Sequence, residues 1–567
     1  MNTKIFPLLA PFLACLACCG PVMATTPTSE NRLVFNQLEI PDVDLNGDGQ
    51  IDILDVMQGL PAATDAIVYI GADSPSDLFV VNENGDAIIQ ESEAAFGRIE
   101  EAAKLASELN VPLFLRGNFS ARSSIRLHSN TYIEGYSSTP PVIHALFGGG
   151  TSLFSVLENS ANVFLGNMKL VEIRQLQRSL VLLYGKNVNV TISEVEFEGS
   201  EVGMTELQTA GVFMFRDWVD DVQIRDCKFT DLQYGIHCVC GVQGLKILRN
   251  EFRRWNYYAV RVARLTLNPG VRTEDIEISH NDFRHAVAGP FRSVILVTRT
   301  DSLVYVKDVQ INNNRVIGNG GAYNRGETDS NATGDQIVLH GVNGFQVSDN
   351  HVFYGGENGI TTSRLSRNGV ISRNIVFGND THGINIGSGY YELSVDNVAG
   401  IEEGDTIRGQ LSEATGTVNS IRVHPSSGRY VLGLTRILGG RIFRNEWLDN
   451  TTTGVQQVVQ CDTIDRTKGI RIVDNHISGN GRDSSDNTPW THGLYVLNSD
   501  SLQIRRNRIF NPNYDENLNA GNLQDQRLSI YLGNSRDILI SDDNQFELGR
   551  QELDEALGMN QSSWLSR

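Results

Sequence analysis

The chain has 567 residues, enough for two or three average domains or for one elongated repeat structure with appendages. Hydrophobic residues make up 40% and charged residues 20%, and the 54 glycines against 15 prolines favour tight turns between short strands over long helices. The 47 basic and 67 acidic residues give a net charge of −20, which argues against nucleic-acid or anionic-membrane partners. Helical bundles and nucleic-acid-binding proteins are therefore the first classes to be excluded.

An export signal over residues 1–24 is the first element that the sequence predicts. A basic residue near the start is followed by an apolar run over residues 5–19 and by small residues up to Ala24. The run is too short to span a bilayer as a stable helix, so we expect cleavage after Ala24 and a secreted or periplasmic protein with no integral membrane segment. Lipoprotein anchoring through Cys19 stays open, because the sequence Leu-Ala-Cys-Cys that ends there loosely resembles a lipoprotein box.

Four cysteines remain after the signal is removed: Cys227, Cys238, Cys240 and Cys461. An even number in an oxidising compartment allows one or two disulfides but not a disulfide scaffold. Cys238 and Cys240 alternate along a predicted strand, which points both sulfurs to the same face.

The acidic segment over residues 25–84 contains the sharpest short motif of the chain. Oxygen-bearing side chains occupy positions 1, 3, 5, 9 and 12 of the loop from Asp44 to Asp55, and Gly49 at position 6 allows a sharp turn. The loop resembles a calcium-binding EF-hand loop, and its closing Asp resembles half of a dockerin repeat. The resemblance implies a structural Ca²⁺ ion held by Asp44, Asn46, Asp48, Gln50, Asp52 and Asp55. The chain has no second copy of the loop, so we expect no cohesin partner.

Downstream of this segment the sequence predicts a repetitive all-β structure. An amphipathic helix over residues 91–109 comes first, and strands then end in Ile or Val, with Asn three residues later and another apolar residue two further on. The repeated asparagines are Asn250, Asn281, Asn314, Asn350, Asn374, Asn475 and Asn507. Their spacings are 31, 33, 36, 24, 101 and 32 residues, and periods in this range indicate a solenoid. We expect the stacked amides to bond in a ladder from coil to coil.

This repeat resembles the right-handed parallel β-helix of the pectate-lyase-like superfamily, which includes polysaccharide lyases, C5-epimerases and glycoside hydrolases. The resemblance implies an all-β solenoid over residues 85–390 and 463–550, capped by the N-terminal helix and followed by a tail over residues 551–567. The gap of 101 residues predicts a small β-module inserted over residues 391–462. We expect a monomer.

The basic middle of the chain suits an anionic ligand. Residues 225–299 hold 12 basic and seven acidic residues, whereas residues 30–101 hold two basic and 16 acidic ones. One strand of each coil contains a triplet whose third residue faces outward by period-two alternation. The triplets begin at Gly235, Ala259, Ser293, Gln336, Gly359, Gly383 and Gly493.

Arg, His, Tyr and Asp residues on or beside these triplets form the predicted site. An Arg neutralises a sugar carboxylate, one side chain removes the neighbouring proton, and another protonates the leaving oxygen. The predicted catalytic residues are His382, Arg261, Tyr258, Asp335 and His340. The predicted substrate-binding residues are Arg264, Arg299, Arg364, His237 and His492. We expect these side chains to be exposed on one face, and the segments around His382 and His492 to stack on adjacent coils once the insertion is looped out.

The segment around His382 carries a second resemblance. Asn379-Asp380-Thr381-His382-Gly383 is similar to the Asn-Asp-Arg-His-Gly segment of mannuronan C5-epimerases. Thr381 stands where that family has Arg, and the family's Asp-Pro-His-Glu motif is absent. Epimerase chemistry and a turn favoured by the fold both account for the similarity.

Three functions remain open. A lyase that cleaves an anionic, uronate-containing polysaccharide by β-elimination fits the export signal and the Arg, His and Tyr face best. A glycoside hydrolase needs clustered carboxylates, which Asp335, Glu357 and Asp380 could supply, although the Asn-Thr-Asp and Asp-Asp motifs of polygalacturonases are missing. The third is a polysaccharide-binding or adhesion solenoid without chemistry.

Overall fold

The computed structural model describes residues 67–71, 78–81, 95–96, 99–547 and 554–555, apart from a set of gaps. The gaps are residues 136–139, 149, 174–176, 201–208, 265–271, 287–292, 300–304, 319–333, 364, 388–390, 424–427, 439–441, 443–445, 466, 481–491, 511–527 and 534. The predicted export signal and calcium loop lie outside the described residues.

Each coil of the solenoid contributes one strand to a 13-stranded parallel sheet, here called sheet B. Its strands are β5 (Ile125–Leu127), β8 (Thr151–Val156), β10 (Gln177–Tyr184), β12 (Ala210–Phe215), β15 (Tyr234–Cys238), β18 (Tyr258–Arg264), β21 (Ser293–Arg299), β24 (Asp335–His340), β27 (Ile360–Ser363), β30 (Ile384–Gly387), β39 (His492–Leu497), β42 (Leu528–Gly533) and β45 (Asp554–Glu555). Consecutive coils pair residue by residue in parallel register, as Ile236 does with Val260 and Val260 with Ile295.

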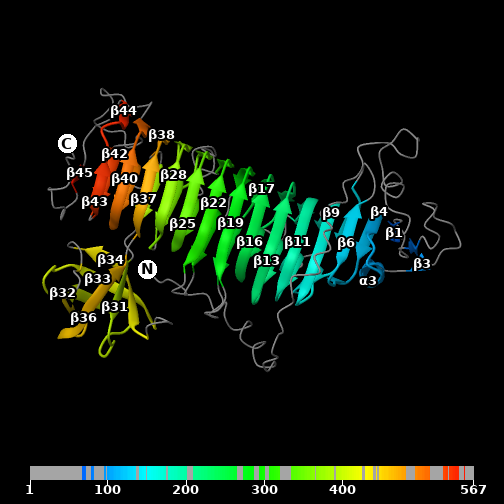
Figure 1. Ribbon diagram of the computed structural model, residues 1–567, viewed down its shortest axis with the longest axis horizontal. Coiled ribbons are helices and arrows are strands. Elements are labelled where there is room, and N and C mark those ends of the chain that lie inside the picture. Colours follow the sequence, from blue (N-terminus) through cyan, green and yellow to red (C-terminus); the bar gives the residue numbers. More distant parts are fainter. Residues whose placement is uncertain are drawn as a thin grey trace. The chain divides into compact units, whose positions relative to one another are not determined.

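The remaining strands of the coils form a 26-stranded sheet, here called sheet A, whose successive members stack in Figure 1. They are β1 (Ile67–Gly71), β2 (Leu78–Val81), β3 (Ala95–Phe96), β4 (Leu113–Ala121), β6 (Thr131–Gly135), β7 (Val142–Ala145), β9 (Ser160–Glu172), β11 (Asn187–Glu198), β13 (Trp218–Arg225), β14 (Lys228–Thr230), β16 (Gly241–Leu248), β17 (Glu251–Trp255), β19 (Thr273–Ser279), β20 (Asp282–Ala286), β22 (Val306–Asn312), β23 (Arg315–Ile317), β25 (Val342–Ser348), β26 (His351–Phe353), β28 (Arg367–Ser372), β29 (Ile375–Phe377), β37 (Thr467–Val473), β38 (His476–Ser478), β40 (Ser499–Arg505), β41 (Arg508–Phe510), β43 (Arg536–Ile540) and β44 (Gln545–Glu547). The first three strands pair antiparallel, and from β4 onward the pairing is parallel.

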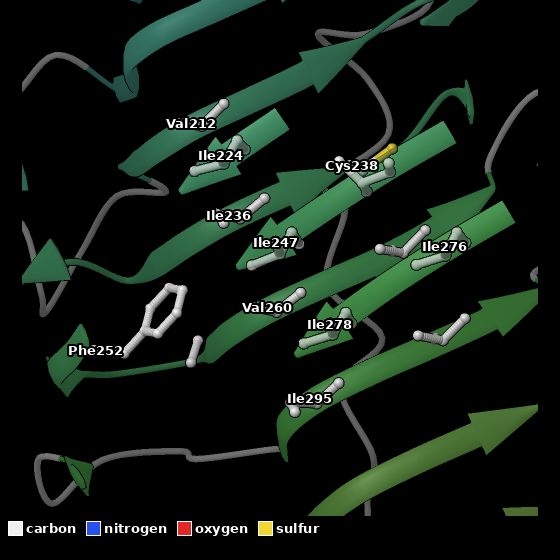
Figure 2. Close-up of a cluster of buried hydrophobic side chains, with 14 of the residues drawn as sticks. Val212, Ile224, Ile236, Cys238, Ile247, Phe252, Val260, Ile276, Ile278 and Ile295 are labelled. Atoms are coloured by element: carbon white, nitrogen blue, oxygen red, sulfur yellow. The ribbon is translucent and has the colours of Figure 1, made fainter. Parts of the chain in front are cut away.

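The core lies between the two sheets because inward positions repeat from coil to coil. Figure 2 shows Ile236, Val260 and Ile295 of sheet B facing Ile247 and Ile278 of sheet A. A row of phenylalanines, Phe197, Phe229, Phe252 and Phe283, stacks with ring centroids 4.6–4.7 Å apart. The helix α3 (Ile99–Leu109) buries one apolar face against the first coils. It begins eight residues later than predicted, because Ala95 and Phe96 pair with β2 as strand β3. The protein is therefore an all-β parallel solenoid with a helix at its N-terminal end, as the sequence predicts.

The asparagine ladder forms at the turn between the two strand sets of sheet A. The side-chain Nδ2 of Asn250 donates to Oδ1 of Asn281, and the contact repeats at each coil through Asn314, Asn350, Asn374, Asn475, Asn507 and Asn544. The residue before each ladder asparagine from Asn250 to Asn507 has a positive φ of 50–61°. The ladder bonds hold this left-handed bend, which is unfavourable for residues other than Gly.

A closed antiparallel barrel interrupts the solenoid between β30 and β37. It consists of β31 (Tyr391–Val395), β32 (Thr406–Gly409), β33 (Thr415–Val423), β34 (Tyr430–Leu438), β35 (Trp447–Asn450) and β36 (Val455–Asp465). The barrel has its own apolar core, which includes Leu393, Leu432 and Leu448, and Leu365 of the solenoid packs into it. Because β30 pairs directly with β39, the segments around His382 and His492 lie on adjacent coils.

The register of one triplet differs from the sequence prediction. Strand β21 pairs with β18 so that Ile295 lies opposite Val260 and Leu296 opposite Arg261. The outward residue of that coil is therefore Leu296, and the predicted triplet Ser293-Val294-Ile295 was wrong by one residue. The error arose because Val294, Ile295, Leu296 and Val297 are all apolar, so alternation gives no signal there.

Candidate functional site

An arginine and a histidine meet on the outer face of sheet B. Arg261 Nη1 lies 3.0 Å from His237 Nε2, and the two residues are paired in the parallel register of β15 and β18. A guanidinium can only donate, so His237 accepts at Nε2 and carries its own proton on Nδ1. Burial, followed by the charge of Arg261, holds the pKa of His237 well below its ordinary value. His237 is therefore neutral and occupied at Nε2.

Aromatic rings surround this pair. The His237 ring stacks on Tyr234 with a centroid distance of 4.2 Å and on Phe213 at 5.0 Å. The Arg261 guanidinium carbon lies 5.5 Å from the centroid of the Tyr258 ring. The rings exclude water around Arg261 and leave the guanidinium as the local source of charge.

The charge of Arg261 is not neutralised by any Asp or Glu within ion-pair distance in the described part of the chain. Its Nε is buried and has no hydrogen-bond partner among the residues that the structure describes. A cation that is partly desolvated and uncompensated is costly unless an anion binds to it. This position therefore suits the carboxylate or sulfate of a ligand.

A second group of polar residues lies at, or just before, the first residue of the next strands of sheet B. Asn358 donates to Asp335 Oδ1 from its backbone N, at 3.0 Å, and from Nδ2, at 2.6 Å. The backbone N of His382 donates to Asn358 Oδ1 at 3.2 Å, and the backbone N of His492 donates to His382 Nδ1 at 3.2 Å. These four residues form a row across four successive coils.

Asp335 and Glu357 form a hydrogen-bonded carboxyl pair beside this row. Burial, the charge of Asp335 and the hydrogen bond to it raise the pKa of Glu357 to about 7. Burial also raises the pKa of Asp335, although the donors of Asn358 oppose that rise. Because Asp335 already accepts two hydrogen bonds from Asn358, the proton that the pair shares near neutral pH belongs on Glu357.

His382 and His492 belong to a stack of four rings. The His382 ring stacks on His492 at 5.3 Å and on Tyr495 at 4.4 Å, and Tyr531 continues the stack at 4.8 Å from Tyr495. Burial, and then the charge of His492, lowers the pKa of His382 to about 3. Since His382 Nδ1 accepts a backbone N–H, the neutral ring carries its proton on Nε2.

The depressed pKa of His382 predicts a loss of stability in acid. Below about pH 6.5 this histidine binds a proton in the unfolded chain but not in the folded protein. The free energy of unfolding therefore falls as the pH drops from about 6.5 towards 3. Between pH 7 and pH 5 the wild type should lose about 2 kcal/mol more than the His382→Gln variant does. Urea unfolding at both pH values measures this difference. The exposed His351, changed to Gln, serves as the control, and equal losses in wild type and His382→Gln would contradict the assignment.

The expectation that the predicted residues are exposed was wrong for several of them. His237 and Tyr258 are each 7% exposed, His382 is 6% and His492 is 1%. Parallel strands lie about 4.8 Å apart, so bulky outward side chains on neighbouring coils stack and cover one another. Only their edges face the solvent.

Arg299 is not free to bind a substrate, contrary to the prediction. Its Nη2 lies 2.6 Å from Glu392 Oε1 of the barrel, and Arg422 contacts the same oxygen at 2.6 Å. The side chains of Arg299 and Glu392 are both buried. The inserted barrel supplies the carboxylate, which no strand pattern of the solenoid could reveal.

The remaining predicted residues are placed as follows. His340 is half-buried at the end of β24, opposite Thr298 and Ser363. Arg264 ends β18 opposite Arg299. Arg364 and the six residues of the calcium loop lie outside the described residues. The structure thus brings together Arg261, His237 and Tyr258 in one group, and Asp335, His382 and His492 in another.

Sequence reasoning missed Tyr234, Phe213, Asn358 and Tyr531. A signal for Tyr531 was present, because Ile530-Tyr531 repeats Leu494-Tyr495 one coil earlier. Asn358 gave none, since its role depends on a turn that places its amide between Asp335 and the backbone of His382.

A cavity of about 440 Å³ lies elsewhere, over β11, β14 and β17 of sheet A. Lys169 pairs there with Glu198 and Arg253 with Glu251, and Lys228 lies between Glu196 and Glu251 in the strand register. It therefore lacks the uncompensated charge found at Arg261, and we place the candidate site on sheet B.

The four cysteines are buried, and no disulfide joins any two of them in the described part of the chain, although their even number allows one or two. Cys238 Sγ and Cys240 Sγ lie 3.8 Å apart within the core. The described residues include no group of three or more His, Cys, Asp or Glu side chains arranged to hold a metal ion. Nor do they include a helix with the length and apolar character needed to cross a membrane.

Comparison with known proteins agrees with the solenoid. Residues 156–399 match the family described as "right handed beta helix region". No curated protein sequence matches the chain. The strand pairing and this family match together identify the protein as a right-handed parallel β-helix with an inserted barrel.

Several solved structures resemble the chain at low identity. The A-module of the mannuronan C-5 epimerase AlgE6 from Azotobacter vinelandii is 12% identical, with a TM-score of 0.36, over 81% of this chain and 94% of that one. The periplasmic alginate epimerase AlgG is 11% identical, with a TM-score of 0.28, over 79% and 77%. The Dettilon tailspike protein gp208 is 12% identical, with a TM-score of 0.38, over 79% of this chain, which spans 58% of the tailspike's length.

Proposed function

We propose that this protein is an exported lyase that cleaves an anionic, uronate-containing polysaccharide by β-elimination. The observation that carries the proposal is the uncompensated charge of Arg261 within a wall of aromatic rings. The guanidinium neutralises the negative charge of a uronate carboxylate bound there, and this makes the proton on the adjacent ring carbon easier to remove. The aromatic edges pack against the sugar ring.

Tyr258 is the base that the geometry favours. His237 is occupied at Nε2 by Arg261, and His382 is occupied at Nδ1 by a backbone N–H, so neither ring offers a free lone pair. Tyr258 contacts the Arg261 guanidinium through its ring and begins the same strand. In the reaction the C5–H and C4–O bonds break, a C4–C5 double bond forms, and the proton passes through Tyr258 to the leaving oxygen.

Ultraviolet absorbance during incubation of the mature protein with alginate, pectate, ulvan and glycosaminoglycans tests this function. A rise in absorbance reports the unsaturated sugar that β-elimination produces and hydrolysis does not. A flat trace on every substrate overturns the lyase proposal. Running the assay with calcium and with a chelator also tests the structural Ca²⁺ proposed for residues 44–55, because a chain that behaves identically in both conditions has no such requirement.

A glycoside hydrolase is the second candidate, and the Asp335–Glu357 pair favours it. A carboxyl group that stays protonated to about pH 7 is a general acid for a leaving sugar oxygen. The two groups are hydrogen-bonded to each other, which is closer than the separation of about 5 Å or more that flanking carboxylates of glycosidases have. A further carboxylate, such as buried Asp380, would be needed.

If the protein is a hydrolase, Glu357→Gln should reduce the release of reducing ends by about 100-fold or more, because the acid is lost. The wild-type rate should fall as the pH rises through about 7, where Glu357 gives up its proton. A reducing-end assay across pH measures both effects, with exposed Glu402→Gln as the matched control. A lyase would keep its ultraviolet signal in Glu357→Gln within a few-fold, and that result would set the hydrolase aside.

A further inference from the structure

The inserted barrel exposes an aromatic side chain on its outer surface. Trp447 begins β35 and is 41% exposed, and Leu411, in the turn that follows β32, is 75% exposed. The backbone N of Gln410, the residue before Leu411, donates to the carbonyl of Trp447 at 3.0 Å. A tryptophan in this position leaves an apolar ring face in water, which is unfavourable unless something packs on it.

A fixed set of polar groups borders the Trp447 ring. Asp449 follows Trp447 by two residues on β35, so both side chains point to the outer face of the barrel. Asp449 is 5% exposed and accepts hydrogen bonds from Gln410 Nε2, at 2.7 Å, and from the backbone N of Gln457, at 2.9 Å. Arg408 lies opposite Asp449 on β32 and contacts it at 3.4 Å. These contacts hold Gln410, Gln457 and Arg408 at Asp449, on the face of the barrel that carries Trp447.

The polar border carries no net charge. Arg408 and Asp449 neutralise each other, and the pKa of Asp449 is lowered by its bonds to Gln457, Gln410 and Arg408 in spite of burial. The remaining border groups are the amides of Gln410 and Gln457, which offer both donors and acceptors. This chemistry differs from that of Arg261 on the solenoid, where a cation stands without a counter-charge.

We propose that this face of the barrel, centred on Trp447, binds an uncharged hexose unit of a polysaccharide. One face of a hexopyranose ring presents C–H bonds that pack on an indole, while its hydroxyls at the ring edge need amide donors and acceptors of the kind that border Trp447. Neutral sugar is the occupant that fits a border without net charge. The site would hold the protein on a mixed polysaccharide, and it does not depend on the proposed β-elimination.

Affinity gel electrophoresis of the full chain tests the proposal. Gels containing galactomannan, xyloglucan, laminarin or dextran should retard the wild type on at least one of the four. Trp447→Ala should weaken that retention by about tenfold or more, and Trp447→Phe should retain part of it, because a smaller ring still offers a stacking face. Val455→Ala removes another exposed apolar side chain of the same barrel and should leave retention unchanged.

The Arg261→Ala variant distinguishes binding at the barrel from binding at the candidate site on the solenoid. Retention on neutral polysaccharide should survive this change, whereas binding to alginate or pectate should weaken. No retardation on any of the four neutral gels overturns the proposal, and so does equal retention of wild type and Trp447→Ala. A wild-type dimer in sedimentation that dissociates in Trp447→Ala would identify a second copy of the chain as the occupant instead. Each of these results can be obtained whether or not the protein has lyase activity.

Discussion

Arg261→Ala is expected to lower kcat/KM on the best anionic substrate by about 100- to 1,000-fold. This is the usual cost of removing one charge-stabilising group from a site that excludes water. Arg261→Lys should recover only part of the activity, since an ammonium cannot contact both a carboxylate and His237 Nε2 in the way a planar guanidinium does. The initial rate of the ultraviolet signal measures both variants.

A matched control separates the local role of Arg261 from the general charge of the protein. Arg315 is exposed on β23 of sheet A, and Arg315→Ala removes one positive charge away from the candidate site. Its rate should stay within about twofold of the wild type, as expected for a surface change. If the Arg261→Ala and Arg315→Ala variants turn over substrate equally fast, Arg261 does not contact the reacting sugar.

The fold was predictable because its signal repeats. Asn250 and the asparagines that follow it recur with an apolar residue three positions before and another two positions after, and each copy marks one coil. The long gap before Asn475 also showed where the solenoid is interrupted, because the ladder resumes directly from Asn374 to Asn475. Because the pattern repeats over many coils, an error in one strand, such as the triplet at Ser293, does not change the predicted fold.

The candidate site was predictable only as a set of residue types on one sheet. Alternation placed His237 and Arg261 on the outer face, but it could not show that Arg261 would occupy His237 Nε2. It also could not show that Glu392 of the barrel would neutralise Arg299. Such pairings depend on contacts between side chains of different coils and on an insertion with its own fold. Neither produces a periodic pattern in the sequence.

Asn350→Ala should lower the free energy of unfolding by roughly 3 to 5 kcal/mol. The Asn350 side chain is fully buried, and its Nδ2 donates to the carbonyl of Ile311 at 2.7 Å and to Asn374 Oδ1 at 3.0 Å. Its Oδ1 accepts from the backbone N of Asn314 at 2.9 Å and from Asn314 Nδ2 at 3.0 Å. Alanine removes the side-chain partner of the Ile311 carbonyl and of the Asn314 backbone N, and each of these two losses costs about 1–3 kcal/mol unless water reaches the group. Asn314 Nδ2 keeps its bond to the carbonyl of Ile278, and Asn374 Oδ1 keeps its bond from the backbone N of residue 350.

Equilibrium unfolding in denaturant measures this loss, and hydrogen exchange at the Asn314 amide locates it. Asn343→Ala is the matched control, because Asn343 lies on the same coil and accepts one exposed hydrogen bond from Asn368, so its loss should cost about 1 kcal/mol or less. Asn350→Asp should not rescue stability, since a carboxylate keeps the acceptors but loses both donors and buries a charge. Stability of Asn350→Ala close to that of Asn343→Ala would mean that the inward-facing core alone holds adjacent coils in register. The ladder would then be a consequence of the left-handed bend before each asparagine rather than what maintains it.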